Sequence, residues 1–255
     1  MVFKSHVVIE VDSNNFSSGK IGSFEILLKN AIKLSQHRQY FMRLENIRIP
    51  TSYYNITTRN NTFIVEEDNG ATQVNVTATI TPGNYLITEL LTELETQLDA
   101  NTVQTNDYTI VRSDITGKIT LSFTGGSTAI TVLSTGKLNK VVGFSESVNS
   151  SSGTSITSPN HVNLSAVRFL KIGTNITSNN SYSKDFQQSI GVKVPITVGR
   201  STVEFYDNHN GHMSKMENTH SLNSIRFRVT DQDNKQIDFN GVDWSCDLIV
   251  YEFRE

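Results

Sequence analysis

Cysteine, charge and long apolar runs are all scarce in this sequence. Its single cysteine, Cys246, excludes an intrachain disulfide framework. Charged residues make up only 18% of the 255 residues, below the usual quarter, and Ser, Thr and Asn take their place. These residue types suit the surfaces of strands and turns. The composition therefore favours a β-rich chain that is long enough for one large domain or two small ones.

The charge pattern argues against nucleic acid and membranes as partners. The formal net charge is -3 without any Lys/Arg cluster, so the chain lacks the basic footprint of a nucleic-acid binder or a membrane-surface protein. No apolar run approaches the length that spans a bilayer. The first residues lack the apolar core and cleavage site of a signal peptide, so we expect synthesis without one.

Both ends of the chain carry the period-two alternation of strands. Apolar and polar residues alternate at 24–29 and 40–49 and again at 225–231 and 244–253. Pro50 cannot donate a ladder hydrogen bond, so the second of these strands should end there. Short strands with regularly spaced turn signals, in two sets far apart in sequence, predict a Greek-key sandwich or jelly roll.

The middle of the chain has a different pattern. One amphipathic helix is predicted from apolar residues at helical spacing, namely Ile87, Leu90, Leu91, Leu94 and Leu98. Hairpins with turns at Asn69-Gly70 and Gly117 flank it. Residues 147–160 are rich in Ser, Thr and Asn and are interpreted as a linker. We therefore predict an all-β fold, a single jelly-roll sandwich at 1–59 and 148–255, with a small α+β insertion domain at 60–147.

Few residues suggest chemistry. Asp207, His209 and His212 have a spacing that could bring three metal ligands together if their loop curls, but an Asn- and Gly-rich loop also carries His simply as a polar residue. We interpret them as a solvated loop and keep them only as weak metal candidates. Cys246 alternates with apolar neighbours, which indicates a buried and inert thiol. We therefore predict a protein without cofactor or metal that is not an enzyme.

Two further polar segments have ordinary explanations. Asp231, Asp233 and Asp238 resemble half of a calcium loop, but the central Gly and closing Glu of that motif are absent. A polar hairpin turn is the better interpretation. Gly125-Gly126 lacks the Lys-Ser/Thr of a phosphate loop and is interpreted as a turn.

Four segments together resemble a known group of viral proteins. They are RLENIRIPTSYYNI near the start, TITPGNYLITELLTELETQL in the middle, LNKVVGFS after it and IDFNGVDWSCDLIVYEF at the end. In these segments the chain is similar to the penton, or minor capsid, proteins of virophages, polinton-like viruses and related double-stranded DNA viruses, which are distant relatives of the adenovirus penton base. The resemblance covers residues 23–253.

The resemblance implies a structural virion protein. Its members form a jelly roll with an insertion domain and assemble as pentamers at the five-fold vertices of icosahedral capsids. The expected partners are four further copies and the neighbouring major capsid protein, with a fiber or host receptor left open, and the expected location is the virion. No basic arm precedes residue 23, so direct genome contact through that end is not expected.

A second class of function fits the same fold. A trimeric spike, fiber or lectin-like module that attaches to a host receptor or glycan would also use a sandwich. Its sugar site would need an exposed aromatic platform, for which Tyr182, Phe186 and Tyr206 are candidates. Interface residues of a pentamer would be sought among the aromatic and Arg side chains Tyr53, Tyr54, Arg168, Phe205, Tyr206 and Trp244.

Overall fold

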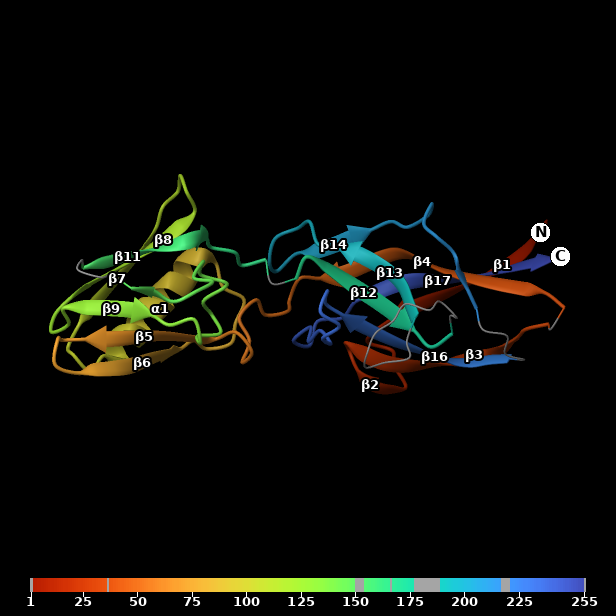
Figure 1. The fold of residues 1–255 in the computed structure, drawn as a ribbon. Coiled ribbons are helices and arrows are strands. Elements are labelled where there is room, and N and C mark those ends of the chain that lie inside the picture. Colours follow the sequence, from red (N-terminus) through yellow and green to blue (C-terminus); the bar gives the residue numbers. More distant parts are fainter. Residues whose placement is uncertain are drawn as a thin grey trace. The chain divides into compact units, whose positions relative to one another are not determined.

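Strands dominate the computed structural model, which describes residues 2–35, 37–149, 154–165, 167–176, 189–216 and 221–254 (Figure 1). The chain divides into two units. The first, the jelly-roll unit, combines Met1–Tyr53 with Val167–Glu255. The second, the inserted unit, is Tyr54–Ala166. Each unit has its own buried apolar cluster, so each is built around its own core.

In its described residues, the jelly-roll unit has eight main strands and two short ones. In chain order the main strands are β1 (Val2–Asp12), β3 (Ser23–Lys33), β4 (Gln39–Pro50), β12 (Phe169–Thr174), β13 (Ser189–Pro195), β14 (Val203–Tyr206), β16 (Ser221–Thr230) and β17 (Ser245–Arg254). The short strands are β2 (Ser18–Lys20) and β15 (Ser214–Lys215). As predicted, the second alternating run ends as a strand at Pro50.

The pairing of these strands confirms the predicted jelly roll. One sheet has the order β1-β17-β4-β14, with β15 also paired to β4, and the other has the order β13-β12-β16-β3-β2. If the eight main strands are counted one to eight along the chain, the sheets read 1-8-3-6 and 2-7-4-5. This order is that of two nested Greek keys, which defines a jelly roll. The first and last strands, β1 and β17, lie side by side (Figure 1).

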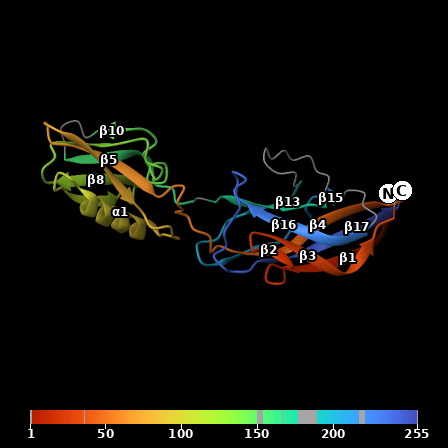
Figure 2. The ribbon, with the colours of Figure 1, turned by 90° about the horizontal axis from the view of Figure 1, so that it is seen from below.

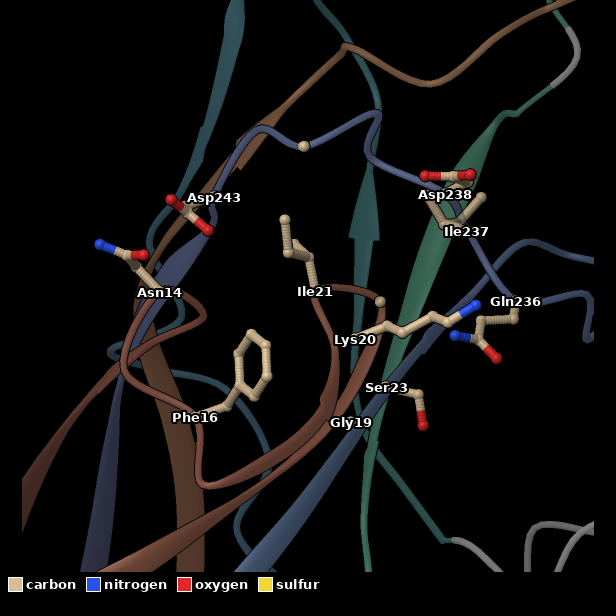
Figure 3. Close-up of a pocket in the computed structure, with 12 residues that line it drawn as sticks. Asn14, Phe16, Gly19, Lys20, Ile21, Ser23, Gln236, Ile237, Asp238 and Asp243 are labelled. Atoms are coloured by element: carbon tan, nitrogen blue, oxygen red, sulfur yellow. The ribbon is translucent and has the colours of Figure 1, made fainter.

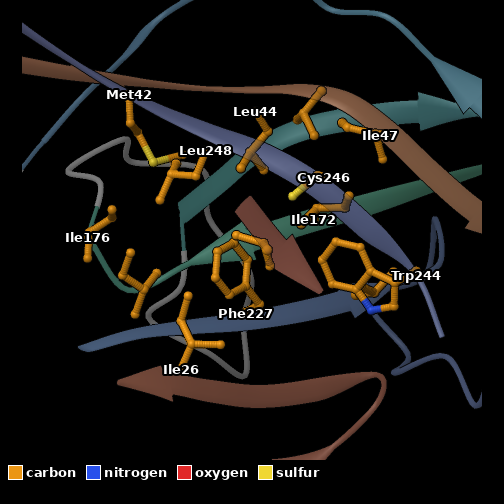
Figure 4. Packing of buried hydrophobic residues seen from close by; sticks show 14 of the residues in the cluster. Ile26, Met42, Leu44, Ile47, Ile172, Ile176, Phe227, Trp244, Cys246 and Leu248 are labelled. Carbon is orange, nitrogen blue, oxygen red and sulfur yellow. The ribbon is translucent and has the colours of Figure 1, made fainter. Parts of the chain in front are cut away.

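The inner faces of the two sheets meet in one apolar core (Figure 4). Alternate residues of each strand point inward, because successive side chains of a strand leave opposite faces of the sheet. The indole of Trp244 packs against the rings of Phe24 and Phe227, and its Nε1 donates a 2.9 Å hydrogen bond to the carbonyl of Ile21. Cys246 is buried there, as predicted, and burial raises the pKa of its thiol.

The described part of the inserted unit contains two small sheets and one helix. Its elements are β5 (Thr62–Asp68), β6 (Gln73–Thr79), α1 (Ile87–Asn101), β7 (Asp107–Arg112), β8 (Lys118–Thr124), β9 (Ala129–Val132), β10 (Val148–Asn149) and β11 (Ser155–His161). One sheet has the order β10-β9-β5-β6 and the other β11-β8-β7. Helix α1 packs along the strands of this unit (Figure 2).

The local predictions for this unit agree with its structure. The helix lies where the apolar spacing placed it, and its buried residues are Leu90, Leu91, Leu94 and Leu98. The first hairpin turns at Asn69 and Gly70, where Gly70 has a φ of 84° and the Asn69 carboxamide accepts hydrogen bonds from the amides of Ala71 and Thr72. No helix within the described residues is long and apolar enough to cross a membrane.

The inserted unit is longer than the predicted insertion at 60–147. The segment 147–160, interpreted above as a linker, contains most of β11, which pairs with β8 of the inserted unit. Ile156 is buried there, and so is Ser158, whose hydroxyl accepts the amide of Ile119 and donates to the carbonyl of Asn160. The linker interpretation was therefore wrong for 155–160. In a sequence, Ser158 is typical of a loop, because its residue type does not show that its hydroxyl is buried and hydrogen-bonded.

A buried carboxylate connects the helix to the sheets of the inserted unit. Glu67 on β5 is fully buried and accepts four hydrogen bonds, from the Thr102 hydroxyl (2.6 Å), the Tyr108 hydroxyl (2.8 Å) and the amides of Val103 (3.0 Å) and Gln104 (2.9 Å). Burial alone would raise the pKa of Glu67, but these hydrogen bonds outweigh it and hold the pKa below its ordinary value. The charged carboxylate thus fixes the segment that follows α1.

We predict that Glu67→Gln lowers the free energy of unfolding of the inserted unit by about 3 kcal/mol at neutral pH, because an amide cannot accept all four hydrogen bonds. Because the pKa of Glu67 is lower in the folded state, its charge stabilises the fold at pH values above the unfolded-state pKa of about 4.3. The difference in unfolding free energy between wild type and variant should therefore shrink as the pH falls below that value. Urea unfolding followed by circular dichroism measures the effect.

The matched control is Glu66→Gln, the next residue on β5, which is half-exposed. The single tryptophan, Trp244, lies in the jelly-roll unit, so its fluorescence should report an unchanged transition. Equal destabilisation by the two glutamine variants would contradict the role given to Glu67.

Candidate assembly surfaces

An aromatic patch covers the outer face of the β1-β17-β4-β14 sheet, opposite the core. Its members are Phe3, His6, Phe41, Tyr251 and Phe253. Phe3 is opposite Phe253 in the strand register, while His6 and Phe41 both pair with Tyr251. Three ring pairs have centroids 5.4–6.3 Å apart, within the range of aromatic pairs. They are Phe3–Tyr251, Phe3–Phe253 and Phe41–Phe253.

The aromatic patch continues onto an exposed edge. β1 pairs with β17 on one side and is the terminal strand of its sheet. Val2, Phe3, Val7 and Val8 are 44–68% exposed, so both faces of this edge strand carry exposed apolar side chains. Long apolar edge strands are pairing templates that soluble proteins usually blunt or cover. The surface therefore has the properties of one that another protein covers.

A hydrogen-bonded ionic cluster lies beside the aromatic patch. Glu45 is buried and forms an ion pair with Arg43, whose guanidinium sits 5.2 Å from the centre of the Tyr251 ring and donates a 2.6 Å hydrogen bond to the Tyr251 hydroxyl. Burial and the neighbouring Glu45 raise the pKa of Tyr251, while Arg43 opposes them. These contacts hold Tyr251 in the patch in one orientation.

The structure brings together only two of the three weak metal candidates. The Nδ1 atom of His209 lies 2.5 Å from the Asp207 carboxylate and 3.3 Å from the carboxylate of Glu45. His212 is exposed on the same loop. Within the described ranges, no group of three or more His, Cys, Asp or Glu side chains is arranged to hold a metal ion. The neighbour that the sequence could not reveal for His209 is Glu45, which comes from a distant strand.

The other polar segments also have structural roles. The Asp231 carboxylate accepts hydrogen bonds from the amides of Asp233 and Lys235, so this segment is the predicted turn. Gly125 has a φ of 141° in the bend after β8, again as predicted.

A pocket of about 850 Å³ lies between the segments 14–23 and 236–243 (Figure 3). Lys20, Asp238 and Asp243 lie along it, so it carries charges of both signs, and no sequence feature predicted it.

The aromatic and Arg residues proposed from sequence fall into two groups. Phe205 and Tyr54 are 69% and 43% exposed, and Arg168 is also exposed, so these are on the surface. Trp244 is buried in the core, and Tyr53 and Tyr206 pack against the core. The two other candidates for a sugar platform, Tyr182 and Phe186, lie outside the described residues.

The sequence predicts a short strand at 6–11, within β1, but its role in a candidate assembly surface was not predicted. The signal was present, because Val7, Val8 and Ile9 are consecutive apolar residues, and a strand with one buried face would alternate. Such a run indicates either burial on both faces or an exposed apolar face. Only the pairing of β1 at the edge of its sheet distinguishes these cases.

Comparison with known proteins places the chain in a family and a fold. The sequence model of a family of unknown function (DUF5901) matches residues 42–243. The chain belongs to this family. The crystal structure of the selenomethionine-labelled mavirus penton protein is similar to it, with a TM-score of 0.58 and 11% sequence identity over 98% of this chain and 100% of that chain. At this identity the likeness establishes a penton-like fold. A search of curated proteins found no match.

We predict that Phe3→Ser weakens self-association of the chain about tenfold, or about 1.4 kcal/mol. The reason is that Phe3 is 52% exposed yet contributes its ring to the aromatic patch, so a covering partner would bury it. Sedimentation velocity over a concentration series measures the change.

Ile115→Ser is the control, because Ile115 is 97% exposed on the β7–β8 hairpin of the inserted unit. If Ile115→Ser abolished association while Phe3→Ser left it at the wild-type level, the aromatic patch would not be an assembly surface.

Proposed function

We propose that this chain is a structural virion protein, the penton subunit that forms the five-fold vertex of an icosahedral capsid. The observation that carries the proposal is the topology. The strand orders are those of a jelly roll, and the inserted unit enters between β4 and β12, the third and fourth main strands. The mavirus penton protein aligns over nearly the whole of both chains, inserted unit included.

The role of such a subunit is assembly, and it is not an enzyme. A five-fold ring is built from one repeated heterologous contact, so each subunit must present two different surfaces that fit each other. The partly exposed aromatic patch and the apolar β1 edge supply one surface that requires a cover. The partners of this function are further copies of the chain and the neighbouring major capsid protein, and its location is the virion.

Native mass spectrometry of the purified full chain tests this proposal. We expect a species of five times the 28.5 kDa chain mass, because a closed ring satisfies every copy of the heterologous contact. A trimer would instead favour a spike or fiber and would contradict the vertex assignment. A chain that stays monomeric both alone and with the other shell proteins would also contradict it.

A further inference from the structure

The two outer faces of the jelly-roll sandwich carry opposite charge. One is the face with the aromatic patch, on the sheet β1-β17-β4-β14. The other belongs to the sheet β13-β12-β16-β3-β2. Because the sheets pack by their inner faces, these outer faces point in opposite directions. Contact between them must therefore join different copies of the chain.

The face with the aromatic patch also carries a surplus of carboxylates. Glu10 of β1 lies directly opposite Asp247 of β17, and Asp12 follows two positions along the same face. Like charges directly opposite each other on paired strands destabilise a sheet. No ion pair to any of these three carboxylates is found within the described residues. Asp247 accepts a 2.6 Å hydrogen bond from Asn46, which is neutral and leaves the charge in place.

The cations of this face are fewer than its carboxylates. Arg43 is paired with Glu45, and the guanidinium of Arg48 lies 5.9 Å from the ring centre of Phe205. The third cation, Lys215 of β15, is exposed and pairs with Phe41 in the strand register. Asn46 has a φ of 48° at the irregularity in the pairing of β4 with β17. Because no cation of the described residues is paired with Glu10 or Asp247, positive charge from another molecule would relieve the repulsion between these two carboxylates.

The opposite outer face supplies that charge. Four cationic side chains alternate with buried residues on its strands, namely Lys171, Lys193, Arg226 and Arg228. Lys171 pairs with Lys193 in the strand register, a second like-charge pair on this molecule. One carboxylate, Glu25, faces them and lies 3.4 Å from Arg226. Cations therefore outnumber carboxylates on the paired strands of this face.

Apolar groups accompany the charges on the basic face as well. The ammonium groups of Lys171 and Lys193 lie 5.7 and 5.6 Å from the ring centre of Phe169. Leu27 of β3 is 67% exposed and pairs with Ser224 on the same face. Both outer faces thus combine an aromatic centre with charges of a single prevailing sign, which is the pattern of complementary interfaces.

We propose that a second copy of this chain docks head to tail, with the basic face of one copy, marked by Lys193 and Arg226, covering the acidic and aromatic face of the next, marked by Glu10, Asp247 and Phe3. This inference rests on the proposed function and specifies the contact that repeats around the ring. The contact is heterologous, so it uses both faces of every copy once the ring closes.

Charge reversal in the full chain tests this contact. The acid-reversed variant is Glu10→Lys with Asp247→Lys, and the base-reversed variant is Lys193→Glu with Arg226→Glu. Each should weaken association at least about tenfold, because like charges then face each other across the contact. The chain that carries all four changes should regain association, since its two faces are complementary again. Sedimentation velocity and native mass spectrometry measure both effects.

Two controls keep the result interpretable. Asp114→Lys reverses the charge of a side chain that is 96% exposed in the inserted unit, and it should leave association unchanged. Trp244 fluorescence and circular dichroism should match wild type in every variant, which shows that the sandwich is intact. Wild-type association should also weaken between about 0.05 and 0.5 M salt, because exposed charges are screened.

The outcomes separate this inference from the proposed function. If a pentamer forms and neither double variant weakens it, the contact assigned here is wrong while the vertex proposal stands. If the four changes together restore an assembly that is not five-fold, the contact stands and the vertex proposal fails. If the quadruple variant is as weak as the double variants, the two faces do not meet and the inference is overturned. A two-fold dimer through the aromatic patch of both copies would overturn it as well.

Discussion

The packing of two sheets through their inner faces determines what the rest of the jelly-roll unit can do. Each main strand contributes alternate residues to one core, in which Trp244, Phe24 and Phe227 are in mutual contact. The remaining residues are thereby directed outward, one set on each side of the sandwich. A sandwich of this kind has two large outer faces and open edges, and its surface chemistry is free to differ between them. In this chain the difference is one of charge, with aromatic groups on both sides.

The inserted unit is stabilised independently of that sandwich. Its core combines the leucines of α1 with strand residues from both of its sheets. Glu67 adds a polar anchor, because it satisfies two backbone amides after the helix that would otherwise need other partners. A unit with its own core can be placed between β4 and β12 without disturbing the strand pairing of the jelly roll. This explains how a chain of 255 residues can hold an intact jelly roll whose halves are separated in sequence.

Local features and the jelly-roll class were predictable from sequence, whereas the pairing of individual distant strands was not. The alternation at 40–49, the leucine spacing of the helix and the turn at Asn69-Gly70 each depend on neighbouring residues, and all three were found. The extent of the insertion was missed because Ser158 is buried through hydrogen bonds that its residue type does not announce. The candidate surface depends on pairing between β1 and β17, which are separated by most of the chain. A single sequence carries no direct signal for such a pairing, so neither the aromatic patch nor the Glu10–Asp247 pair could be derived from it.

The proposed contact joins opposite faces of neighbouring sandwiches in a closed ring. A single-particle cryo-electron microscopy reconstruction of the purified assembly tests it most directly, because it shows both the symmetry and the facing sheets. We expect a five-fold ring in which the β1-β17-β4-β14 sheet of each subunit faces the β13-β12-β16-β3-β2 sheet of the next. A ring in which both of these outer faces remain open to solvent, or a two-fold assembly of identical faces, would contradict it.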